Sequence, residues 1–168
     1  MKHKLTKLLF FPVLLACLFS FSCVLNDDSD SQCEFEPATL PDSAFYTCGI
    51  YDKEIFDLIH AYRKNLGLTT LWPADSDILE VGLANSKSMA QKGKLIDYKL
   101  PELEKYSDVK KLIAANSADN AEEVLNILLK DHDYKSALEN EKFKYAAVKG
   151  TMLKETKQWF YTIILCNY

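Results

Sequence analysis

The chain has 168 residues, of which 48% are apolar and 26% charged, and it carries five cysteines, five glycines and five prolines. This length fits one domain, and the near-average composition excludes an intrinsically disordered chain, a collagen and a polytopic membrane protein. Twenty lysines and arginines against 24 acids give a net charge of −4. Because phosphate binding needs a basic face, we expect no nucleic-acid partner.

Residues 1–22 have the pattern of an export signal. Three lysines (Lys2, Lys4 and Lys7) precede an apolar run from Leu8 to Phe21 that contains no charge. A basic start followed by an apolar run shorter than the ~20 residues of a membrane span is typical of a cleaved signal. Its removal takes away three lysines and no acid, so the net charge changes from −4 to −7.

A cysteine directly follows the apolar run. Ser20-Phe21-Ser22-Cys23 resembles the relaxed lipidation box of spirochaetal lipoproteins, in which a small residue precedes the cysteine that becomes lipidated. Leu14-Leu15-Ala16-Cys17 fits the general box better, but cleavage there would leave an apolar stub. We therefore expect Cys23 rather than Cys17 to carry the acyl chains, palmitate among them, and to anchor the protein to a bacterial envelope membrane, at the outer membrane surface. An ordinary secretory signal is the alternative.

The chain after Cys23 divides into a tether and one domain. Asn26–Ala44 is rich in Asp, Ser, Glu and Pro and has few large apolar residues, so it cannot bury enough surface to offset its chain entropy. We expect a signal peptide in residues 1–22, a lipidated cysteine and flexible acidic tether in residues 23–44, and one folded domain in residues 45–168.

The domain pattern predicts helices first and a strand pair last. Apolar residues at three- and four-residue steps predict a helix that begins near Asp52 and ends at Gly67. Asp77 and Glu80 form a capping box for a second helix, which ends at Gly93.

The second half of the domain contains the predicted strands. Expected elements are a short helix over 107–113, a helix opened by Asp119 and Glu122, a helical turn over 133–139, and strands at 145–152 and 158–166. Residues 159–165 are apolar on both faces, which predicts a central strand covered twice. The fold class that follows is α/β, a three-layer α-β-α sandwich with a central, mostly antiparallel sheet.

Four short motifs resemble the CAP superfamily (cysteine-rich secretory proteins, antigen 5 and pathogenesis-related 1). They are Ile59-His60-Ala61-Tyr62-Arg63 with Gly67-Leu68, Met89-Ala90 with Gly93, Ala121-Glu122-Glu123-Val124, and Trp159-Phe160-Tyr161-Thr162. They resemble the family's first, second and third helices and its last strand. The resemblance spans residues 55–165 and implies a sandwich of CAP type.

Family members often place two histidines and two acids across a cleft, a set that can hold zinc. Along the resemblance, Asp97 replaces the first histidine, Tyr134 replaces the second, and the expected glutamate near residues 112–113 is missing. His132 lies two positions away from the second site. The resemblance thus implies a cleft without this chemistry, and we expect no catalytic residue, no metal and no cofactor. Asp97 and Tyr134 are expected to face one another in a hydrogen bond.

We therefore expect a monomeric, non-enzymatic surface protein that interacts with host or envelope molecules, a host protein or lipid among them. One alternative is a carrier of a small lipid, a sterol or fatty acid, as some CAP proteins are. The other is a hydrolase that uses Asp97, Tyr134 or His132. The sequence contains no nucleophile motif that supports the hydrolase.

Three cysteines remain once Cys17 and Cys23 are assigned to the signal and the anchor: Cys33, Cys48 and Cys166. Cys48 precedes the first helix and Cys166 ends the last strand. A Cys48–Cys166 disulfide would close most of the domain and stabilise it by ~4 kcal/mol. Reduced thiols are the alternative, since a sequence does not give the separation of the two Cα atoms.

Overall fold

The computed structural model describes residues 33–104, 106, 108–116 and 120–167, all of which belong to one compact unit, Ser31–Tyr168. The predicted signal peptide and Cys23 lie outside the described residues. Within the described ranges, none of the helices has both the length and the apolar character that a membrane crossing requires.

Four α-helices form in the unit. They are α1 (Gly49–Asn65), α2 (Ser76–Lys92), α3 (Ala121–Lys130) and α4 (His132–Leu138), together with the short 3-10 helices η1 (Asp42–Ala44) and η2 (Pro101–Leu103). The Asp75 side chain caps α2 by accepting a hydrogen bond from the Ile78 amide at 3.1 Å, and Asn120 caps α3 in the same way. The capping residues therefore differ from the predicted Asp77 and Asp119, the second of which lies outside the described residues.

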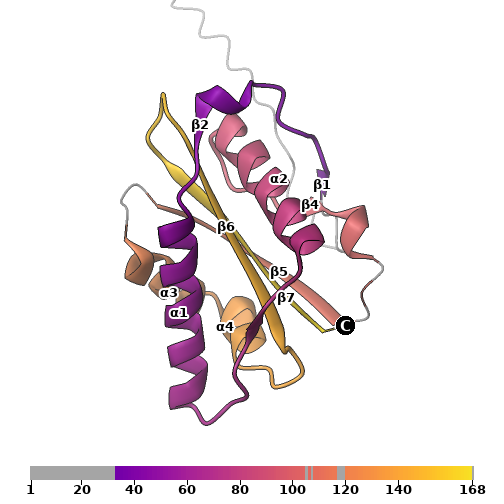
Figure 1. Cartoon of the computed structure of the whole chain (residues 1–168), viewed down its shortest axis with the longest axis vertical. Coiled ribbons are helices and arrows are strands. Elements are labelled where there is room, and N and C mark those ends of the chain that lie inside the picture. Colours follow the sequence, from indigo (N-terminus) through magenta and orange to yellow (C-terminus); the bar gives the residue numbers. More distant parts are fainter. Residues whose placement is uncertain (1–32, 105, 107, 117–119, 168) are drawn as a thin grey trace, which may run out of the picture. The chain divides into compact units, whose positions relative to one another are not determined.

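The main sheet has five strands. They are β2 (Phe45–Tyr46), β3 (Trp72–Pro73), β5 (Asp108–Asn116), β6 (Tyr145–Leu153) and β7 (Trp159–Asn167), in the order β2-β6-β7-β5, with β3 also paired to β6 (Figure 1). All pairs are antiparallel except β3 with β6. Two further strands, β1 (Cys33–Glu34) and β4 (Tyr98–Lys99), pair separately. The central position predicted for the last strand is confirmed, because β7 lies between β6 and β5.

The predicted helix over 107–113 is wrong, because its described residues, 108–113, belong to β5. β5 pairs with β7 along nine residues, from Asp108 opposite Asn167 to Asn116 opposite Trp159. The side chains of β5 alternate between the two faces of the sheet, with Leu112 and Ala114 in one core cluster and Ile113 in the other. This pairing outweighs the local polar pattern of the sequence.

Two hydrophobic clusters lie on opposite faces of the sheet. One contains residues of α1, α3 and α4, such as Ile59, Val124 and Leu138, and the other contains residues of α2, such as Ile78 and Met89. Both contain residues of β5, β6 and β7. This arrangement confirms the predicted three-layer α-β-α sandwich.

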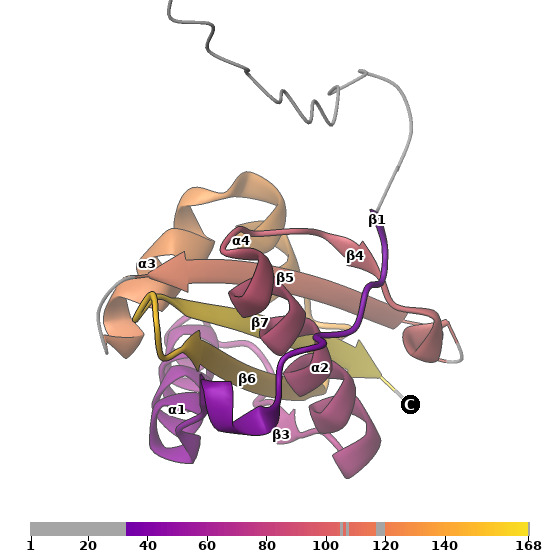
Figure 2. The same cartoon turned by 90° about the horizontal axis from the view of Figure 1, so that it is seen from above.

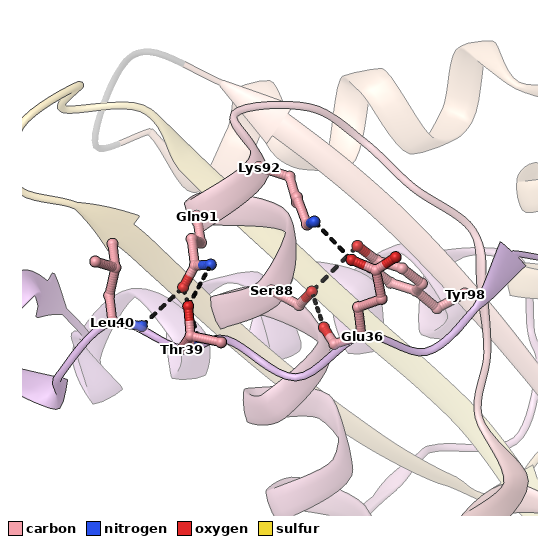
Figure 3. Close-up of polar contacts among 7 residues, drawn as sticks. All are labelled: Glu36, Thr39, Leu40, Ser88, Gln91, Lys92 and Tyr98. Carbon is pink, nitrogen blue, oxygen red and sulfur yellow. Dashed lines mark hydrogen bonds and ion pairs between the residues drawn. The ribbon is translucent and has the colours of Figure 1, made fainter. Parts of the chain in front are cut away.

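Residues 35–42, which we call the strap, run along α2 between β1 and η1 (Figure 2). The Thr39 and Leu40 amides donate to Oε1 of Gln91 at 2.8 and 2.9 Å, and Glu36 forms a 2.6 Å ion pair with Lys92 (Figure 3). The predicted tether extends to Ala44, but these contacts place the strap in the folded unit. Individual polar contacts hold it there, although its composition resembles that of a linker.

Candidate functional site

Asp97, Lys111 and Tyr134 gather at the outer edge of β5. Asp97 precedes β4, Lys111 lies on β5 and Tyr134 lies on α4. The Lys111 ammonium is 2.8 Å from Oδ1 of Asp97 and also donates to the backbone carbonyl of Tyr98. The Lys111 side chain is 6% exposed, whereas that of Asp97 is 52% exposed. The ion pair therefore has one buried partner and one partner in contact with water.

Burial governs the electrostatics of this pair. Desolvation lowers the pKa of Lys111 below its ordinary value, and the hydrogen bond and charge of Asp97 oppose this effect. The buried cation is paired with Asp97 and donates a hydrogen bond to the Tyr98 carbonyl. A cation buried in this way needs both partners, because removing either leaves it incompletely solvated.

Tyr134 covers the edge of the sheet beside this pair. It packs against both core clusters, and the backbone of Ile113 forms a hydrogen bond with its hydroxyl group. Burial raises the pKa of Tyr134, and the charge of Asp97 contributes to the increase. Asp97 and Tyr134 are thus close enough to interact electrostatically. Lys111 contacts the Asp97 carboxylate and Ile113 contacts the Tyr134 hydroxyl, and the hydrogen bond expected between Asp97 and Tyr134 stays a prediction.

The sequence pattern did not reveal Lys111. This residue lies next to residues 112–113, where the resemblance implies a glutamate. Because a helix was predicted over 107–113, the position of Lys111 in a strand was not expected. In the described part of the chain, no group of three or more His, Cys, Asp and Glu side chains could hold a metal ion. The chemistry available at this edge is that of an ion pair and a phenol.

Neither His60 nor His132 takes part in this edge site. The His132 side chain is 96% exposed and has Asp133 as its contact, at 3.6 Å. His60 lies on α1, where its ring is 6.4 Å from that of Phe56. Neither arrangement positions an imidazole against Asp97 or Tyr134.

Arg63, part of the first motif, is completely buried. Its guanidinium donates to the carbonyl oxygens of Leu138 at 2.6 Å, Asn140 at 3.0 Å and Phe143 at 3.3 Å, and also to that of Thr69 at 3.2 Å. These bonds join the end of α1 to the loop between α4 and β6. Arg63 therefore has a structural role in the domain.

Of the two alternatives for Cys48 and Cys166, the structure has the reduced thiols, because both cysteines are free. Cys166 pairs with Tyr145 at the start of β6, whereas Cys48 follows β2, which pairs with Met152 and Leu153 at the other end of β6. Tyr145 and Met152 are seven residues apart along β6, roughly 20 Å at ~3.3 Å per residue, and Cys48 follows the partner of Met152 by only two residues. A disulfide requires Cα atoms within about 7 Å, so the two thiols cannot meet in this fold.

A hollow of about 380 Å³ lies between the strap, α2 and η2, on the other side of the sheet from α1. Its apolar lining residues are Phe35, Ile78, Val81, Ala84, Leu100, Leu103 and Tyr106. Three acids also belong to the described lining: Asp77, Glu80 and Glu102. We call this the α2 pocket. The sequence pattern did not reveal it, because its wall includes a residue of the strap.

Comparison with known proteins gives structural matches alone. No protein-family model and no curated protein sequence matches this chain. An outer surface protein from Borrelia burgdorferi is similar at a TM-score of 0.63 and 14% identity, over 73% of this chain and 97% of that one. A cysteine-rich secretory protein from Staphylococcus aureus is similar at a TM-score of 0.56 and 15% identity, over 71% of this chain and 38% of that one. With its three layers and these two structural relatives, the chain has a CAP-like fold.

Proposed function

We propose that this chain is an exported lipoprotein, anchored through Cys23 at the bacterial cell surface, whose CAP-like domain binds a partner and performs no catalysis. The observation that carries the proposal is the Asp97–Lys111 ion pair, in which a buried ammonium lies against the residue that replaces a family histidine. A divalent ion at Asp97 would compete with this ammonium for the carboxylate. The Borrelia protein of similar fold is an outer surface protein, which supports the location.

Zinc titration tests the non-catalytic part of the proposal. The unit of residues 31–168 with Cys33 and Cys48 replaced by serine would be melted with and without millimolar zinc. We expect the melting temperature to stay unchanged, because the Asp97 carboxylate is already paired with Lys111. A saturable increase that disappears in Asp97→Asn would contradict the proposal, as would hydrolysis of a general ester or peptide substrate that depends on His132.

Labelling with an alkynyl palmitate analogue tests the anchor. The full chain would be produced in a bacterium that has the lipoprotein pathway, as wild type, Cys23→Ser and Cys17→Ser. Label that is lost in Cys23→Ser and kept in Cys17→Ser is expected. The reverse result would assign the anchor to Cys17. A wild-type chain that takes up no label would contradict lipidation.

The partner is proposed to be a host or envelope molecule, bound by the domain as a monomer. The unit of residues 31–168 would be immobilised and exposed to host extracellular fractions and to bacterial envelope fractions, with a cysteine-rich secretory domain of similar fold as the control. Specific retention of one component is the expected result. Retention of the same components by both domains would contradict a specific partner.

The second candidate function, a small-lipid carrier, is favoured by the α2 pocket. Its volume of about 380 Å³ lies near the lower end of the ~300–1,000 Å³ typical of small-ligand sites. Native mass spectrometry of the purified unit would test it. A copurified sterol or fatty acid supports the carrier, and a spectrum of unliganded protein together with no binding of either lipid in solution contradicts it.

A further inference from the structure

The α2 pocket has an apolar floor. Ile78 is completely buried, and Leu100 and Leu103 are buried as well. These side chains come from α2 and from the turn that contains η2, while Val81 and Ala84 extend the same helix face toward the solvent. A ligand in this pocket would therefore bury an alkyl or aryl group against aliphatic side chains.

The wall formed by Phe35 is held in place before any ligand binds. The Phe35 ring packs edge-on against Tyr98, with ring centroids 5.6 Å apart. Its neighbour Glu36 is bonded to α2 twice, because Ser88 donates to its backbone carbonyl and Lys92 pairs with its carboxylate (Figure 3). Tyr98 is buried and contacts the Ser88 hydroxyl at 3.1 Å. A wall fixed in this way loses little conformational entropy when a ligand binds.

The described charged residues of the pocket all have one sign. Asp77, Glu80 and Glu102 belong to the lining, which includes no lysine, arginine or histidine among the residues described there. All three acids are exposed, so they lie in contact with water rather than in the apolar floor. Glu80 and Glu102 form no ion pair with another described residue, whereas Glu36 and Glu104 nearby are paired with Lys92 and Lys99.

These features favour one class of ligand. An apolar chain would fill the floor, and the group at its end would meet carboxylates. A fatty-acid carboxylate would be repelled there, whereas an ammonium would be attracted. We infer that the α2 pocket binds a small cationic amphiphile, an alkyl or aryl group that ends in an ammonium. The inference uses the pocket of the second candidate function and assigns the charge of its ligand.

Three probes with one alkyl chain test the inference: n-octylammonium, n-octanoate and n-octanol, which stay monomeric in the millimolar range. Each would be titrated into the ¹⁵N-labelled unit of residues 31–168 while amide signals are followed by NMR. We expect octylammonium to shift the signals of Ile78, Val81 and Leu103 saturably, octanol to do so at least threefold more weakly, and octanoate to leave them unchanged. Octanoate binding at these residues as tightly as octylammonium would overturn the inference, as would no shift with any probe.

Two variant pairs separate charge from shape. Glu80→Gln should weaken the binding of octylammonium at least threefold and leave the binding of octanol unchanged. Glu54→Gln, at an exposed position of α1, should change the affinity for neither probe. Ala84→Phe places a ring in the pocket and should abolish binding of both probes, while Ala61→Phe, at an exposed position of α1, should not. Octylammonium binding that survives both pocket variants would overturn the inference. Tight octanoate binding that is lost in Ala84→Phe would overturn it too, and would leave the lipid-carrier candidate standing.

Discussion

The Lys111 ammonium lies 2.8 Å from the Asp97 carboxylate, in a setting where the lysine is buried and the aspartate is half exposed. This pair occupies the edge of β5 beside Tyr134, at one of the positions where the resemblance would place a histidine. Desolvation of Lys111 lowers its pKa, because burial penalises the charged amine more than Asp97 compensates. The folded state thus holds this proton less tightly than the unfolded chain does.

The first prediction concerns the pH dependence of stability. Below the lowered pKa, Lys111 is charged in both states and the folded state carries the cost of burying it. As the pH rises through the lowered pKa toward the ordinary value of 10.5, this cost is relieved. Wild type should therefore gain unfolding free energy relative to Lys111→Met between pH 7 and that value. Urea unfolding of both chains across this range measures the difference.

Asp97→Asn is the companion variant. It removes the negative charge beside the buried ammonium and leaves an amide oxygen as a neutral acceptor, and should cost about 1–3 kcal/mol at neutral pH. Lys111→Met removes the buried charge itself and should cost less than Asp97→Asn at the same pH. A difference between wild type and Lys111→Met that stays constant with pH would contradict the lowered pKa, and equal costs for the two variants would contradict the buried ion pair.

The sandwich itself could be predicted because its signals are periodic. The spacing of apolar residues predicts the helices α1 and α2, and a run that is apolar on both faces predicts the strand β7. The three layers follow because helices must cover both faces of that strand. β5 was missed because Lys110 and Lys111 interrupt its alternation. Lys111 can occupy a buried position only because Asp97 and the Tyr98 carbonyl lie beside it. Both partners are more than ten residues away in the chain, so the residues around Lys111 do not predict the contact.

Contacts between single residues explain the other differences. The first helix was expected to begin near Asp52, but Asp52 is buried within α1 and accepts hydrogen bonds from the Gly150 amide at 2.9 Å and from Lys149 at 3.2 Å. The strap was expected to be a tether, but Gln91 and Lys92 bind it to α2. Both cases depend on long-range partners that composition and periodicity do not reveal.

The second prediction concerns Arg63. A lysine at this position keeps the charge but cannot donate to four carbonyl oxygens, so Arg63→Lys should cost about 3 kcal/mol of unfolding free energy. Lys64→Met, at an exposed position of the same helix, should change the stability by less than ~0.5 kcal/mol. Chemical denaturation measures both. If Arg63→Lys is as stable as wild type, the carbonyl contacts do not hold α1 to the loop after α4.

The third prediction concerns Gly150. A Cβ atom at this position would lie 2.4 Å from the Tyr161 ring and 3.3 Å from Oδ1 of Asp52, so Gly150→Ala should cost about 1–3 kcal/mol through overpacking. Gly49→Ala is the matched control, because a Cβ there meets nothing within 4 Å. The control should be neutral or slightly stabilising. Equal melting temperatures for the two variants would contradict the close packing of the Tyr161 ring, on β7, against Gly150 of β6.

The fourth prediction concerns the two thiols. Burial raises the pKa of Cys166 to about 11, whereas Cys48 is partly exposed beside the start of α1. In the unit of residues 31–168 carrying Cys33→Ser, a disulfide reagent at pH 8 should therefore modify one thiol in the folded state and the second only after unfolding. Cys48→Ser should remove the fast reaction and leave the slow one.

The same pair gives a pH test of the fold. Because the unfolded thiol ionises near 9 and the folded one near 11, Cys166 should make the protein lose stability as the pH rises from 9 to 11, and Cys166→Ala should reduce that loss.

Mild oxidation of the folded chain should leave the sulfurs of Cys48 and Cys166 unjoined, since they lie toward opposite ends of β6. A monomer that loses two hydrogens on oxidation without unfolding, with Cys48 and Cys166 joined in its peptide map, would contradict this placement.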